Sequence, residues 1–134
     1  MKNGILSVPG AVGVSNHMVS KATADRKVMD TVMSFLKKNR LFFFDSMTAP
    51  DSVCAAAAAA AGVRYARRDV FLDVEDDSEY IEKQALKLRK IAFTKGTATA
   101  VCHYRQVTIK TLARMMPAMA ADGIEFVKLS ELVK

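Results

Sequence analysis

Residues 41–62 read LFFFDSMTAPDSVCAAAAAAAG and contain the pattern that decides the fold. Four consecutive apolar residues, 41–44, predict a strand that is covered on both faces, as the strands of parallel sheets are. Pro50 and Asp51 then open a predicted helix through the alanines 55–61, and Gly62 is a suitable residue to end it. The stretch therefore predicts one β-strand followed by one α-helix, the repeating unit of α/β proteins.

The same alternation continues in both directions, with a period of roughly 25 to 30 residues. Before this unit we expect a strand at 11–15 and a helix at about 24–38. After it we expect a strand at either 63–66 or 70–72, a helix from Ser78 to Gly96, a strand at 97–102, a helix at about 106–121 and a strand at 124–129. Pro117 should kink or restart the last helix. Successive units of this kind give parallel strands joined by right-handed crossovers.

The length of 134 residues fits a single domain with one core. Five strands are too few to close a barrel, so the chain is either a small open sheet or part of a barrel. No apolar stretch reaches the roughly 18 residues that span a bilayer. The N-terminus does not have the pattern of a signal peptide.

The formal net charge is +6, but the basic residues are scattered and interleaved with acids. Aromatic residues that could stack on bases do not accompany them, so a solvated surface is favoured over nucleic-acid binding. Cys54 and Cys102 form no CxxC pair, and we interpret both as small buried thiols.

Both histidines of the chain follow predicted strands: His17 in AVGVSNHMVS and His103 in TATAVCHYRQ. Binding and catalytic groups gather at the C-terminal ends of parallel strands, and imidazole binds metals and transfers protons near neutral pH. We therefore expect His17 and His103 at one end of a parallel sheet, sharing a metal or a substrate. The alternative is two unrelated surface or core histidines. Further polar residues at strand ends would line the same rim: Asn16, Asp45, Ser46, Asp69, Asp73, Tyr104 and Ser130.

Several motifs together resemble the divergent polysaccharide deacetylase family. These are SNHMVSKATAD, LFFFDSMTAP, RRDVFLDVEDD, AVCHY and GIEFVKLSELV, and the resemblance runs from about Pro9 to Val133. It implies parallel βα units that form part of a distorted (β/α) barrel, with the N-terminal units missing. Residues 1–134 would then be a single partial domain, the C-terminal part of that barrel.

The resemblance also implies a metal-dependent hydrolase that removes N- or O-acyl groups from a polysaccharide or oligosaccharide. A divalent metal, with zinc the expected ion, would polarise the acyl carbonyl and activate a water. His17 matches a metal ligand, and His103 a second ligand or the catalytic acid. Asp45 and Asp69 match acidic positions with orienting roles in catalysis. Asn16, Ser46, Asp73 and Tyr104 are the candidates for substrate binding. The family also implies a periplasmic or secreted protein.

The chain departs from the family pattern at several positions, where Val19, Met47 and Cys102 replace a glycine, an arginine and a glycine. The family portion that carries paired aspartates would precede this chain. We therefore expect a fragment of a deacetylase that is inactive alone. The alternatives are a non-catalytic module that binds carbohydrate or a cell-envelope protein, and a basic nucleic-acid-binding domain. A strand at 11–15 without its usual neighbour would leave an exposed sheet edge for self-association.

Overall fold

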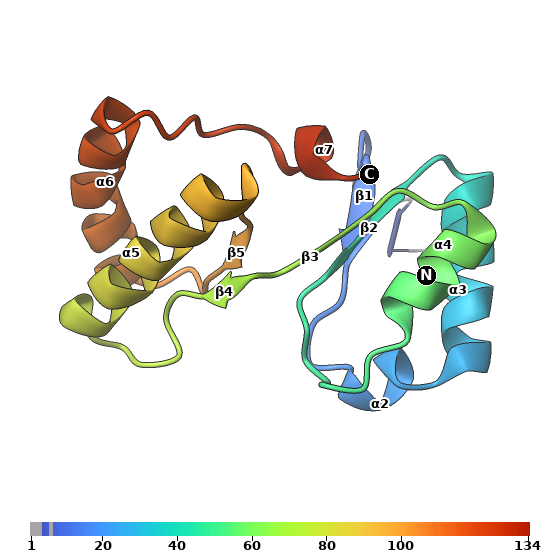
Figure 1. Cartoon of the computed structure of the whole chain (residues 1–134). Coiled ribbons are helices and arrows are strands. Elements are labelled where there is room, and N and C mark those ends of the chain that lie inside the picture. Colours follow the sequence, from blue (N-terminus) through green and yellow to red (C-terminus); the bar gives the residue numbers. More distant parts are fainter. Residues whose placement is uncertain (1–3, 6) are drawn as a thin grey trace. The chain divides into compact units, whose positions relative to one another are not determined.

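The computed structural model describes residues 4, 5 and 7–134. The chain divides into two compact units (Figure 1). Unit 1 comprises Met1–Arg67 and Ser130–Lys134, and unit 2 comprises Arg68–Leu129. Each unit has its own small parallel sheet.

Unit 1 contains a three-stranded sheet of order β1-β2-β3. Its elements are β1 (Gly13–Ser15), α2 (Ser20–Thr23), α3 (Arg26–Lys38), β2 (Phe42–Asp45), α4 (Cys54–Ala61) and β3 (Tyr65–Arg67), with α7 (Leu129–Leu132) entering it at the C-terminus. Both strand pairs are parallel, with Val14 opposite Phe43 and Phe44 opposite Ala66. On its other side, β3 exchanges two backbone hydrogen bonds between Tyr65 and Lys134.

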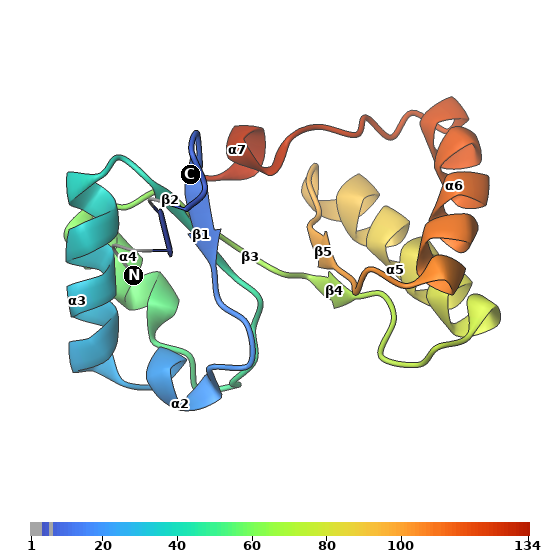
Figure 2. The same ribbon diagram turned by 180° about the vertical axis from the view of Figure 1, so that it is seen from behind.

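Helices α3 and α4 lie side by side against this sheet (Figure 2). The Asp25 carboxylate caps α3 by accepting hydrogen bonds from two backbone N–H groups of the first turn. The small alanine side chains let α4 approach its neighbours closely. The helix ends at Gly62, which adopts a φ of +64°. The core of unit 1 consists of buried apolar residues from both helices and the strands: Met29, Met33, Leu36, Leu41, Phe43, Cys54, Ala57, Ala58 and Val63.

The contact between β1 and β2 depends on a glycine. Gly13 is the register partner of Phe42, and the Phe42 ring lies across the space above Gly13. A Cβ atom at position 13 would meet the ring carbon Cε2 at 2.3 Å, far inside van der Waals contact. Only glycine lets the ring pack in this position.

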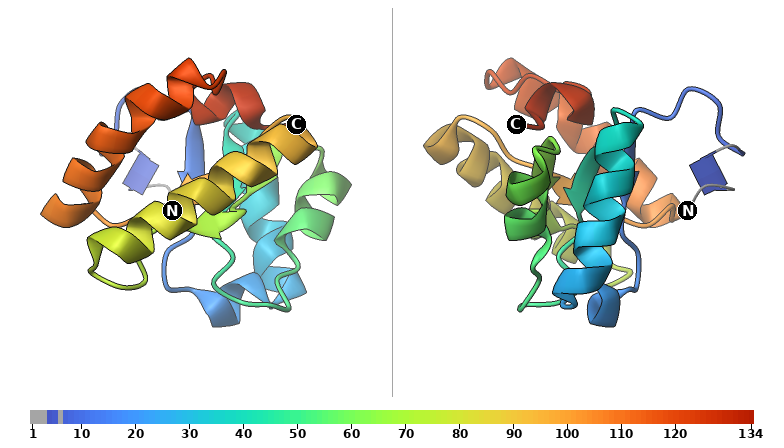
Figure 3. Two further views of the ribbon diagram at one scale, coloured as in Figure 1. Left: turned by 60° about the vertical axis from the view of Figure 1, so that its left-hand side comes forward. Right: turned by 90° about the vertical axis from the view of Figure 1, so that its right-hand side faces the viewer.

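Unit 2 contains β4 (Val70–Phe71), α5 (Ser78–Lys95), β5 (Ala100–Val101) and α6 (Gln106–Ala121). The strands β4 and β5 are parallel, with Val70 opposite Ala100. Helix α5 packs against α6 (Figure 3). The buried residues Val70, Leu72 and Ala85 form the centre of this core.

The predicted parallel βα units are confirmed, and the described residues show no closed barrel. The two alternatives for the third strand are both strands, β3 and β4, in separate sheets. Helix α6 continues through Pro117 as one helix. None of the helices in the described ranges is long and apolar enough to cross a membrane.

Two expectations were wrong. Residues 124–128 form no strand, because no strand among the described residues pairs with them, and Phe126 is 48% exposed. Cys102 is exposed, because it follows the short strand β5 beyond the packed core, whereas Cys54 is buried as expected.

Candidate functional site

An aspartate–histidine pair in unit 2 is the best-defined candidate site. Asp73 lies two residues after β4, and His103 lies two residues after β5. Because these strands are parallel and Phe71 is opposite Val101, the two polar residues extend from the sheet side by side. The His103 backbone N–H donates to both Asp73 carboxylate oxygens, at 3.0 and 2.9 Å. The imidazole Nδ1 lies 3.0 Å from Asp73 Oδ1.

The surroundings hold Asp73 in place and leave the imidazole accessible. Asp73 is fully buried, and the Thr108 hydroxyl donates to its Oδ2 at 2.8 Å. Arg105 donates to the Asp73 backbone carbonyl at 3.1 Å. The His103 side chain is 41% exposed, and its ring packs against Phe71 with centroids 5.1 Å apart. A carboxylate beside Nδ1 favours the proton on that nitrogen in neutral imidazole, and Nε2 remains for a substrate.

Asp45 in unit 1 is buried and satisfied within the protein. Its carboxylate accepts hydrogen bonds from the backbone N–H of Met47 at 2.8 Å and from the Ser52 hydroxyl at 2.7 Å. The Tyr65 hydroxyl lies 3.3 Å from the same carboxylate. Burial, and next the negative charge of Asp45, raise the pKa of Tyr65 well above its usual range. Tyr65 therefore stays protonated and acts as a hydrogen-bond donor.

Asn16 and Ser46 join the ends of β1 and β2. The Asn16 side chain accepts from the Ser46 backbone N–H at 2.8 Å and donates to the Thr48 hydroxyl at 3.1 Å. The Ser46 hydroxyl donates to the Asn16 backbone carbonyl at 2.7 Å. Both residues are buried, so these contacts hold the loops at the ends of the two strands.

The remaining predicted residues occupy different places. His17 is exposed two residues after β1 in unit 1, so its association with His103 stays a prediction. Tyr104 is 96% exposed, directly after His103. Asp69 comes before β4 and thus lies at the end of that strand opposite to Asp73.

At that opposite end, Asp69 joins the last residue of α5, Lys95, to Thr99, the residue just before β5. It accepts from the Lys95 ammonium at 2.9 Å and from the Thr99 backbone N–H at 3.0 Å. Burial acts to raise the pKa of Asp69, but the hydrogen bonds from Lys95 and Thr99 outweigh it and hold that pKa below its usual value.

Sequence reasoning missed Thr108 and Arg105, which hold Asp73, and Ser52 and Tyr65, which hold Asp45. The structure shows that Thr108 is fully buried, and a buried hydroxyl needs a partner.

The described residues of neither unit by themselves fit a zinc site. Catalytic zinc takes three protein ligands. Residues 4, 5 and 7–134 contain no group of three or more His, Cys, Asp or Glu side chains that could hold a metal ion. The Asp73 carboxylate already accepts hydrogen bonds from the His103 backbone and from Thr108.

Comparisons with known proteins show which family model and which proteins this chain is similar to. The family model for divergent polysaccharide deacetylases matches residues 1–133. The chain is 33% identical over 133 residues to the uncharacterized protein YibQ of Escherichia coli K12, covering 99% of this chain and 41% of YibQ. It is 35% identical over 125 residues to an uncharacterized protein of Haemophilus influenzae, covering 93% of this chain and 44% of that protein.

A solved structure shares the fold. It is the crystal structure of the uncharacterized protein ATU2773 from Agrobacterium tumefaciens C58, which is 27% identical with a TM-score of 0.88. The match covers 91% of this chain and 50% of the ATU2773 chain.

This chain spans less than half the length of YibQ and of the Haemophilus influenzae protein. Because the family model covers almost every residue, the chain belongs to the divergent polysaccharide deacetylase family.

Proposed function

We propose that this chain supplies the general acid, His103, for hydrolysis of acyl groups on a polysaccharide or oligosaccharide. The observation that carries the proposal is the fully buried Asp73 carboxylate beside Nδ1 of a half-exposed imidazole. Family membership supplies the substrate class. The relatives are more than twice as long as this chain, so the hydrolytic activity is proposed for a longer protein.

In this reaction water adds to the acyl carbon, and the bond from that carbon to the sugar nitrogen or oxygen breaks. The departing amine or alcohol needs a proton, and Nε2–H of the His103 imidazolium can donate it. Asp73 fixes the direction of the ring, as the aspartate of a catalytic triad does.

We further propose that the longer protein uses a divalent metal, with zinc the expected ion, and that His17 is one of its ligands. Asp45 and Asp69 would each support the fold of their own unit rather than contact the substrate, because each already binds neighbouring protein groups. A polysaccharide substrate of the cell envelope would place the protein in the periplasm or outside the cell.

The test is acetate release from acetylated chitooligosaccharide and xylan in the presence of zinc. We expect no appreciable release by the chain alone. We expect release by a chimera in which the chain replaces the matching part of YibQ. In that chimera, His103→Ala should lower the rate by about 10²–10⁴-fold, as loss of a general acid does. An active chimera that keeps its rate in His103→Ala would contradict the proposal.

A second candidate function is carbohydrate binding without hydrolysis, and the 96% exposed Tyr104 beside His103 favours it. Exposed aromatic rings offer a flat apolar surface together with a polar group. Tyr104→Ala should then abolish retention of the chain on insoluble polysaccharide, whereas a chelator should have no effect. Retention that Tyr104→Ala leaves unchanged would reject this function.

A further inference from the structure

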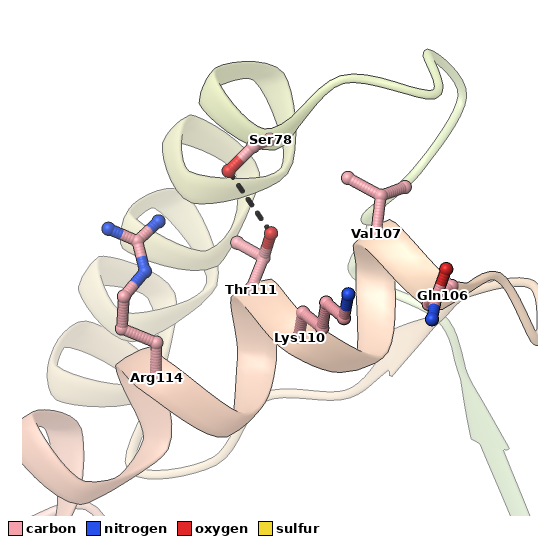
Figure 4. A pocket seen from close by; sticks show the side chains of 6 residues that line it. All are labelled: Ser78, Gln106, Val107, Lys110, Thr111 and Arg114. Atoms are coloured by element: carbon pink, nitrogen blue, oxygen red, sulfur yellow. Dashed lines mark hydrogen bonds between the residues drawn. The ribbon is translucent and has the colours of Figure 1, made fainter.

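Unit 2 contains a pocket of about 450 Å³ that the aspartate–histidine pair does not use. It lies between the beginnings of α5 and α6 (Figure 4). The residues that line it are Ser78, Gln106, Val107, Lys110, Thr111 and Arg114. Pockets for small ligands measure about 300–1,000 Å³, so the space suits a small polar ligand.

The lining carries positive charge. Lys110 and Arg114 are four residues apart on α6, so they lie on one face of the helix. Neither aspartate nor glutamate is among the lining residues. Glu82 lies beside the pocket and is engaged by Arg114 and by the Ser78 hydroxyl. Lys110 has no ion-pair partner within the described part of the chain, so its charge is available to a ligand.

Neutral donors complement the charge of Lys110. The Thr111 side chain belongs to a buried residue, and its hydroxyl lies 3.2 Å from the Ser78 hydroxyl. Gln106 begins α6, and Arg105 at the N-cap position provides no side-chain cap for the first backbone N–H groups. Backbone N–H groups at a helix N-terminus add to the preference for a negative ligand that Lys110 sets.

We infer that this pocket binds the carboxylate of an acidic sugar unit, an inference that rests on the proposed function for the choice of a glycan. The first turns of α6 connect the two sites. Arg105 and Thr108 hold Asp73, while Gln106 and Val107 between them line the pocket. A uronic acid unit bound at Lys110 would therefore hold the glycan on the helix that also supports the catalytic pair.

The experiment is calorimetric titration of the whole chain with oligogalacturonate, with neutral chitooligosaccharide and with inorganic phosphate. We expect oligogalacturonate to bind, and binding to weaken as salt rises. Lys110→Gln should weaken it about fivefold, the effect of one exposed charge pair. Lys87→Gln is the matched control, because Lys87 is an exposed helical lysine outside the pocket. It should leave the affinity unchanged.

Equal losses in Lys110→Gln and Lys87→Gln, or no loss in Lys110→Gln, would show only general attraction to a basic protein and overturn the inference. Binding of phosphate without binding of oligogalacturonate would also overturn it, because the ligand would then be a free oxyanion. His103→Ala should keep oligogalacturonate binding. A failure of the acid role in catalysis is therefore distinguishable from a failure of the pocket.

Discussion

Single residues decide how closely the elements of this protein approach. Gly13 is such a residue, because the Phe42 ring occupies the space that any larger side chain would need. We predict that Gly13→Ala lowers the free energy of unfolding by about 1–3 kcal/mol, the usual cost of overpacking. Urea unfolding followed by circular dichroism measures it. Gly4→Ala is the control, since nothing lies within 4 Å of a Cβ atom at position 4. Equal stability of the two variants would contradict the packing argument.

Thr108 is the residue whose side-chain hydroxyl holds the buried carboxylate of the candidate site. Its hydroxyl donates to the buried Asp73 carboxylate at 2.8 Å. Thr108→Val keeps the shape and removes the donor, so we expect a loss of about 1–3 kcal/mol of stability from the carboxylate left short of a partner. Thr94→Val removes an exposed hydroxyl that binds only the Lys90 carbonyl of its own helix, and it should change stability by less than about 0.5 kcal/mol. Matching denaturation midpoints for the two variants would argue against the role of Thr108.

At the scale of elements, Asp69 connects the C-terminal end of α5 to Thr99, just before β5, by hydrogen bonds. Its pKa is lowered in the folded protein, so the unfolded chain binds the proton more tightly. The contribution of Asp69 to stability is therefore fully present above its unfolded pKa, near 3.8, and is lost as the pH falls through the lower folded value. We predict that the stability difference between the wild type and Asp69→Asn is largest near pH 7 and shrinks below pH 4.

Unfolding free energies measured from pH 2 to pH 7 check this prediction. Asp76→Asn is the control, because Asp76 is exposed and outside this contact. A difference between wild type and Asp69→Asn that stays constant over the whole range would show that the charge of Asp69 is not involved.

At the scale of the whole molecule, we expect the protein to self-associate through the edge strand β1. β1 stands at an edge of its sheet and, among the described residues, pairs with β2 alone. Val12 beside it is 59% exposed. Open strand edges with apolar neighbours pair readily with other chains. We expect the weight-average mass in light scattering to rise with concentration, and Val12→Lys to suppress the rise. A monodisperse monomer at high concentration would reject this prediction.

The alternation of strands and helices, and the polar residues at several strand ends, could be predicted from the sequence. Both are local properties: an apolar run such as Phe42–Phe44, a helix cap and a glycine stop act within a few residues of one another. The positions of Asp73 and His103 after their strands followed from the same reasoning. The family resemblance was also contained in these local motifs.

Only the tertiary structure decided which acid meets His103. Asp69 and Asp73 are four residues apart, and their separation to opposite ends of β4 depends on where that strand begins and how it pairs with β5. The same holds for residues 124–128, whose apolar side chains predicted a strand that has no partner to form it. A strand exists only where another strand completes its hydrogen bonds, and strand register sets which side chains meet. Both conditions join residues far apart in sequence, so the local pattern could not determine them.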